Sequence, residues 1–179
     1  MTILLRSIHS ISENKDPSPN GVLNKIIDSM QEGLSGEQSL DIVYAIFDRK
    51  KFELNYILLG DIFIAHQEHS TGKLNYIQSN NSSLHKTSHF DLKIKTIKLN
   101  PNDRLVFITK GGYLSKGHND EVFGKENLMK SIASAPKTGA HELRNYISYS
   151  LKKFLHNDKP QRDTTIVVAE VKDRVIKLA

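Results

Sequence analysis

Residues 99–111 read LNPNDRLVFITKG. Asparagine, proline and aspartate at the start of this stretch favour a tight turn. The run RLVFIT that follows (104–109) is short, apolar and bounded by turn residues, which predicts a central strand. It leads into Lys110, Gly111 and Gly112, which we expect to form a flexible strand end. The rest of the fold is assigned outward from this strand.

Upstream, the apolar residues predict a series of strands preceded by a helix. Residues 42–47 and 52–58 flank a turn at Arg49 to Lys51, which is a hairpin signature. Shorter strands are expected at 62–66, 74–77 and 92–99. A helix is expected from Pro19 to near Gly33, because proline is tolerated in the first turn of a helix. Residues 1–10 are also expected to be helical rather than a signal peptide.

Downstream, two helices and a buried strand complete the pattern. The first helix is expected at 125–135, and Thr138 is expected to cap the second. The apolar face of the second helix includes Leu143, Tyr146 and Ile147, and a final strand is expected at 164–171. Helices and strands are grouped rather than alternating, so we predict the α+β class and a single domain spanning residues 1–179.

Composition excludes several classes of protein. The chain has no cysteine, so disulfides and cysteine-based zinc sites are excluded and a reducing, cytoplasmic location is expected. No apolar run approaches the roughly 18 residues of a membrane span, so no membrane association is expected. The net charge of +5 is dispersed, without a basic block interleaved with aromatics. Solvated surfaces explain it better than nucleic-acid binding, which we do not predict.

The motifs resemble the SpoIIE/RsbU-like branch of the PPM-type metal-dependent serine/threonine phosphatases. In that family a Leu-x-Pro-Gly-Asp turn precedes a strand ending in Thr-Asp-Gly, and residues 99–111 follow this order with Lys110 in place of the aspartate. Residues 162–168 (RDTTIVV) resemble the terminal Asp-Asp-x-Thr strand, with Arg162 at the first aspartate. The hairpin at 44–61 resembles the strand pair before an Asn-Ala-Gly-His turn, with Asp61 at the histidine.

Phe123 and Gly124 also match the Phe-Gly pair that precedes the family's penultimate helix, so the resemblance runs from about residue 3 to residue 171. It implies a PPM-like antiparallel β-sandwich flanked by helices. The chain begins about where the helix after the family's first glycine-rich turn would begin. We therefore expect the first strands, and the aspartates of that turn, to have no counterpart.

The resemblance implies a metal site whose ligands are largely replaced. PPM-type enzymes use paired divalent cations to activate water, and hard cations such as Mg²⁺ and Mn²⁺ need anionic oxygen ligands. Among the motif positions Lys110 and Arg162 are cations, Gly111 matches the motif glycine, and only Asp163 keeps a carboxylate. We therefore predict degenerate metal motifs, with no catalytic residue, no bound metal and no cofactor.

Lys110 and Arg162 have two interpretations. They form surface ion pairs, with Asp163 or Asp61, which contribute at most about 1 kcal/mol when exposed. Alternatively they form a cationic pocket that holds a phosphate or an acidic side chain, since lysine and arginine next to glycine N–H groups suit anions. Histidine pairs at 66/69 and 85/89 lack cysteine partners and are expected to be solvated rather than to bind zinc.

These patterns predict a catalytically inactive, protein-binding or regulatory domain of bacterial signalling. Absent first strands would leave a sheet edge open, which suits a protein partner or a homodimer. In the family the partners are anti-sigma-factor antagonists and switch kinases of stress or sporulation circuits. Whether the chain is an enzyme stays open. The alternative is an active phosphatase that uses Mn or Mg, with ligands that are unusual or donated by another chain, and dephosphorylates such an antagonist.

Overall fold

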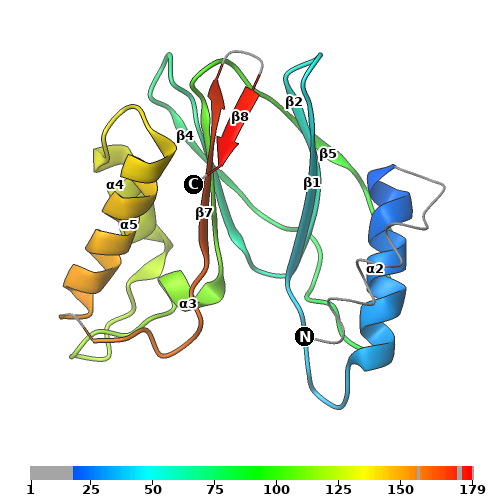
Figure 1. Cartoon of the computed structure of the whole chain (residues 1–179). Helices are drawn as coiled ribbons and strands as arrows, with labels where there is room; N and C mark the ends of the chain where they lie inside the picture. The colour runs from blue at the N-terminus through cyan, green and yellow to red at the C-terminus, as the bar shows by residue number, and fades with distance from the viewer. Residues whose placement is uncertain (1–17, 157, 173–174, 179) are drawn as a thin grey trace. The chain divides into compact units, whose positions relative to one another are not determined.

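The computed structural model describes residues 18–156, 158–172 and 175–178. They fall into two compact units, each with its own antiparallel sheet (Figure 1). Of the described residues, unit 1 comprises those in 18–61 and 79–98, and unit 2 comprises those in 62–78 and 99–178. The α+β class and the antiparallel sheets are confirmed. The helix expected at residues 1–10 lies outside the described residues, and the single-domain assignment stays a prediction.

Unit 1 contains helix α2 (Pro19–Gly33) and a sheet in the order β1 (Ile42–Asp48), β2 (Glu53–Leu59), β5 (Lys95–Lys98). The helix begins where the sequence predicts, because the Ser18 hydroxyl accepts a hydrogen bond from the Gly21 amide at 3.1 Å. Its apolar stripe packs in one cluster with Ile57 and Leu59 of β2. Figure 1 shows α2 lying beside this sheet.

Strand β5 is shorter than the expected 92–99 strand. It pairs with β2 only from Lys95, opposite Tyr56, to Lys98, opposite Glu53. Beyond Tyr56, the Leu58 carbonyl accepts hydrogen bonds from the side chains of Ser79 and Asn81, at 2.9 and 3.0 Å. These loop residues, rather than residues 92–94, form the hydrogen bonds to this part of β2, so β5 begins only at Lys95.

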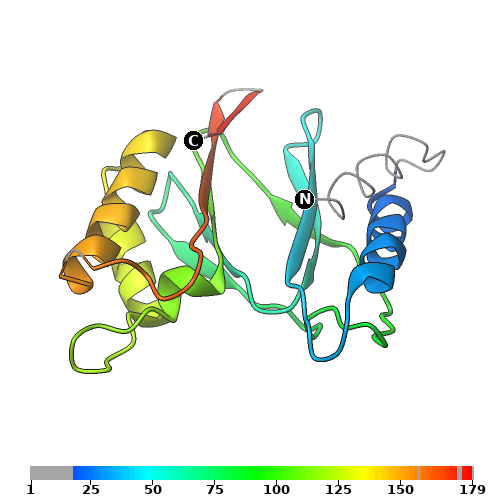
Figure 2. The same cartoon turned by 60° about the horizontal axis from the view of Figure 1, so that its bottom comes forward.

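Unit 2 has a five-stranded sheet in the order β4 (Leu74–Ile77), β3 (Phe63–Gln67), β6 (Arg104–Ile108), β7 (Ile166–Lys172), β8 (Val175–Leu178). Strand β6 is central, as its apolar sequence predicts. Helices α4 (Gly124–Ser134) and α5 (Ala140–Phe154) lie side by side against one face of this sheet (Figure 2). The core between the helices and the sheet contains Phe63, Val106, Leu128, Leu143, Ile147 and Val168, all fully or almost fully buried.

The predicted turn before β6 is organised by a buried carboxylate. Asp103 is fully buried, and its side chain accepts hydrogen bonds from the backbone N–H groups of His69 and Asn100, both at 2.9 Å. The ring nitrogen Nε2 of His66 lies 2.9 Å from Asp103 Oδ2. His66 is therefore a buried structural partner of this turn and not the solvated histidine that the sequence predicts.

Two local predictions in unit 2 are wrong. Lys110 to Gly112 do not extend a strand but begin a single helical turn, α3 (Lys110–Tyr113). Thr138 does not cap α5, which begins after Gly139, whose N–H donates to the buried Glu170 carboxylate at 3.1 Å. Tyr146, which the sequence places on the apolar face of α5, is 36% exposed. Among the described residues, no helix has the length and apolar character needed to cross a membrane.

Candidate functional site

The pairing of β6 with β7 brings the two degenerate motifs of unit 2 together. Ile108, at the end of β6, pairs with Ile166, at the start of β7. Just beyond this pair the Thr109 N–H donates to the Thr165 carbonyl at 3.2 Å, and the Thr165 N–H donates to the Thr109 hydroxyl at 2.9 Å. The segment at Lys110 therefore lies directly beside the segment at Asp163.

Gly111 is the point of closest approach between the two segments. A Cβ atom at this position would lie 2.2 Å from the Asp163 carbonyl oxygen and 2.9 Å from the Arg162 carbonyl oxygen. Only glycine fits there, because both obstacles are backbone atoms that cannot rotate away. The atoms that approach Gly111 are carbonyl oxygens, which repel anions, so any anion site at this junction depends on the Lys110 and Arg162 side chains.

Solvent exposure decides how strongly the motif cations act. Arg162 and Asp163 are exposed, and Lys110 is half-buried. At 4 Å a pair of unit charges interacts by about 4 kcal/mol at an effective dielectric of 20, but by about 1 kcal/mol in bulk water. A divalent metal ion doubles these values, so its repulsion by exposed Arg162 at this distance is closer to about 2 kcal/mol than to about 8 kcal/mol. Loss of ligands weakens this site for metals more than the added positive charge does.

The residues at the junction do not fit a pair of hard divalent cations. Of the four motif residues only Asp163 provides a carboxylate, whereas such cations require several anionic oxygens. No group of three or more metal-ligating side chains occurs within the described parts of the chain. Asp61, at the position of the family's histidine, follows β2 in unit 1 and is half-buried.

The side chains of Arg162 and Asp163 do not form an ion pair with each other among the described residues. The described contacts at this loop involve its backbone, including the Arg162 carbonyl, which accepts a hydrogen bond from the Thr164 hydroxyl at 3.3 Å. The nearby Gln161 side chain bonds the backbone N–H and carbonyl of Lys116, which ties the loop to the segment after α3. The anion-binding role of Lys110 and Arg162 stays a prediction.

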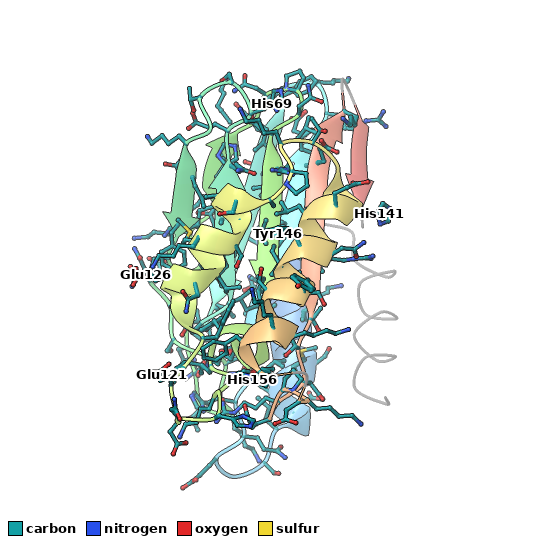
Figure 3. The ribbon with its side chains drawn as sticks, turned by 90° about the vertical axis from the view of Figure 1, so that its left-hand side faces the viewer. His69, Glu121, Glu126, His141, Tyr146 and His156 are labelled. Atoms are coloured by element: carbon teal, nitrogen blue, oxygen red, sulfur yellow. The ribbon has the colours of Figure 1, made fainter. Side chains whose placement is uncertain are left out.

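A second feature of unit 2 is a hollow of about 540 Å³ that lies away from the motif residues. It is lined by α4, α5 and the loop before α4, including Phe123, Lys130, Tyr146, Tyr149, Lys153 and His156. Figure 3 shows Tyr146 between the two helices, with Glu126 and His141 on their outer sides. Of the described lining residues Glu121 alone is a carboxylate, so the hollow does not offer a metal cage either.

Two tyrosines of α5 are the sequence signal for this hollow. Tyr146 and Tyr149 lie three residues apart, so they share a face of α5. Tyr149 is 63% exposed, and an exposed aromatic of this size marks a surface more than a core. The sequence gives no local signal for the backbone contact at Gly111, because this contact depends on the path of the loop before β7.

The family model of stage II sporulation protein E (SpoIIE) matches residues 1–172 of this chain. Similar solved structures include the SiaA-PP2C domain of Pseudomonas aeruginosa, with a TM-score of 0.73 and 16% identity over 93% of this chain and 65% of that one. The phosphatase domain of SpoIIE from Bacillus subtilis has a TM-score of 0.60 and 13% identity over 95% and 73%. The RsbU and RsbW domains of a Mycobacterium tuberculosis protein have a TM-score of 0.73 and 18% identity over 96% and 46%.

These matches and the fold described above define a domain with the fold of the PPM-type phosphatases. The chain belongs to the SpoIIE family, because the family model covers nearly its whole length. No curated protein matches the sequence significantly. The chain spans 65% of the SiaA domain and less than half of the mycobacterial structure, so activity, substrates and partners do not transfer directly.

Proposed function

We propose that this chain is a SpoIIE-family domain that has lost phosphatase activity and acts by binding another protein. The observation that carries the proposal is the junction of β6 and β7. There two motif segments meet in the described structure, but contribute Lys110, Arg162 and a single carboxylate, Asp163. A dinuclear metal centre that activates water needs several carboxylates at this place.

The role in signalling is part of the same proposal. The RsbU domain of the mycobacterial relative occurs in one structure with an RsbW domain, which supports a partner of the switch-kinase or anti-sigma-antagonist kind. A regulatory domain of this type would bind a partner without dephosphorylating it and would compete with an active phosphatase for that partner. The absence of cysteine is consistent with a reducing cytoplasm as the place where it acts.

The competing proposal is a working phosphatase whose remaining ligands come from another polypeptide. It is motivated by Asp163, which is exposed and free to contribute one oxygen. The two proposals differ in whether this chain, alone or mixed with another polypeptide, hydrolyses a phosphorylated substrate.

The test is phosphate release from a phosphothreonine peptide in excess Mn²⁺, with an active SpoIIE-family phosphatase assayed in parallel. We expect the wild-type chain to release no more phosphate than buffer. Hydrolysis that requires Mn²⁺, stops with EDTA and is lost in Asp163→Asn would overturn the proposal. Adding the chain to the active enzyme then tests regulation, since a competing binder lowers the rate on a protein substrate but not on the short peptide.

A further inference from the structure

We propose that β1 is a dimerisation strand, which pairs antiparallel with β1 of a second copy of this chain about a two-fold axis at Ala45. This rests on the proposed function only in that the chain acts by binding. It adds the particular strand, its register and the choice of a second copy as the partner, which the open sheet edge expected from the sequence left undecided.

The two edges of the unit 1 sheet differ in charge. Among the described residues, the sheet order β1-β2-β5 makes β1 and β5 the edge strands. Strand β5 is protected in the usual way, with a lysine at each end, Lys95 and Lys98. The stretch 42–47 of β1 (IVYAIF) contains no charge and no proline. A long, apolar, unprotected edge is a template for another strand.

The hydrogen bonds of β2 show which backbone groups of β1 point outward. On the β5 side of β2, the Leu58 carbonyl bonds to Ser79 and Asn81, and the Gly60 N–H donates to the Asn81 carbonyl. Along an antiparallel strand the backbone N–H and C=O groups of successive residues point to alternate sides. The odd-numbered residues of β2 therefore direct these groups toward β1. Those residues pair with Ile42, Tyr44 and Ile46.

The remaining residues of β1, namely Val43, Ala45 and Phe47, therefore direct their N–H and C=O groups away from β2. No described residue forms a hydrogen bond to them there. A two-fold axis at Ala45 places Ala45 opposite its own copy, and Val43 of each chain opposite Phe47 of the other. Every one of these pairs is then of the hydrogen-bonded kind, in which two residues exchange both N–H···O bonds.

Side chains favour a second copy as the occupant of this edge. A symmetric pair repeats each contact, so any charge near the axis would face its like. Ala45 is small, neutral and exposed, and it sits on the axis. Val43 and Phe47 form a β-branched and aromatic cross-strand pair, a combination that stabilises sheets. The same arrangement of β5 would bring lysines close to lysines.

Ala45→Pro tests the hydrogen bonds. Because the Ala45 N–H points away from β2, proline removes an outward donor and leaves the β1–β2 ladder intact. We expect sedimentation equilibrium to show a wild-type dimer that Ala45→Pro weakens about tenfold or more, since both bonds at the axis are lost. Thr96→Pro is the matched control, because it removes an outward donor from the opposite edge strand and should leave the dimer unchanged.

A charge exchange tests the axis without altering the backbone. Ala45→Lys and Ala45→Glu should each be monomeric, because like charges would lie directly opposite, and an equimolar mixture should recover a heterodimer. Concentration-dependent protection of the Val43, Ala45 and Phe47 amides against hydrogen exchange would support the same register. If Ala45→Pro proves unfolded by circular dichroism, the charge exchange decides.

A wild-type chain that stays monomeric at its highest soluble concentration overturns the inference. So does a dimer that tolerates both charges at position 45, since its interface then lies elsewhere. Phosphate release is an independent readout: an active dimer would refute the proposed function alone, and an inactive monomer would refute the dimer alone.

Discussion

Arg104 provides a sharp test of how unit 2 is held together. Its side chain is 2% exposed, and its Nη2 and Nε donate to the Gln67 side chain at 2.6 and 3.0 Å. Nη1 donates to the Pro136 carbonyl at 2.6 Å. Glu170, the residue opposite Arg104 on β7, is 1% exposed. Burial lowers the pKa of Arg104, and the charge of Glu170 acts in the opposite direction.

Replacing Arg104 by methionine keeps much of the side-chain volume but leaves the Gln67 side-chain oxygen and the Pro136 carbonyl without their donor. Hydrogen bonds from a charged group contribute about 1.5–3 kcal/mol each, so we expect a loss of about 2–4 kcal/mol. With an m-value of about 2 kcal/mol/M, the urea midpoint of unit 2 should fall by about 1–2 M. The double variant Arg104→Met/Gln67→Met should cost less than the sum of the single variants by about 1–2 kcal/mol, because the Gln67 oxygen is then no longer left without a donor.

The assay is amide hydrogen exchange of β6 and β7 in urea, which reports the opening of unit 2 itself. Lys130→Met is the control, because it breaks an exposed ion pair with Glu126 and should lower the midpoint far less than Arg104→Met does. The reasoning fails if Arg104→Met lowers stability by less than about 1 kcal/mol, or if the two single losses simply add.

Three further predictions concern local features. Gly111→Ala should destabilise unit 2 by about 1–3 kcal/mol in chemical denaturation, because its Cβ would collide with the Asp163 carbonyl; an unchanged midpoint would contradict the contact. Asp103→Asn should cost about 2–3 kcal/mol, since an amide nitrogen would face donors that the buried carboxylate accepts, and a melting curve like that of the wild type would disprove this. The Lys130 ammonium lowers the pKa of Glu126, first through a hydrogen bond, so the pair stabilises the fold above the ordinary glutamate pKa of about 4.3 and the effect is lost as pH falls through the lower folded value. The melting-temperature gap between wild type and Glu126→Gln should therefore close in acid, and a gap that persists would exclude this linkage.

Much of the fold could be predicted from periodicity and turn chemistry. The hairpin of β1 and β2 is encoded by two apolar runs around a polar turn, and β6 by its apolar run after the Asn-Pro-Asn-Asp turn. Helix α3 could not be predicted, since two of its four residues are glycines with poor helix propensity. It forms because Gly111 packs against the loop before β7, a contact between segments distant in sequence.

The candidate site was predictable only in part. The motif order pointed to Lys110, Gly111, Arg162 and Asp163, and the β6–β7 ladder explains why these positions adjoin. Local sequence did not reveal that carbonyl oxygens face Gly111 or that Arg162 is exposed, because both depend on tertiary packing. The strand β8 was also missed, although β4, which is equally short, was predicted.

The most direct test of the central claim is a Mn²⁺ titration followed by amide NMR, in which a bound paramagnetic ion broadens nearby signals. We predict no saturable, site-specific broadening of the Gly111 and Asp163 amides at concentrations that occupy the metal centre of an active family member. Selective, saturable broadening of these amides that disappears in Asp163→Asn would show that the junction still binds metal and would contradict the account.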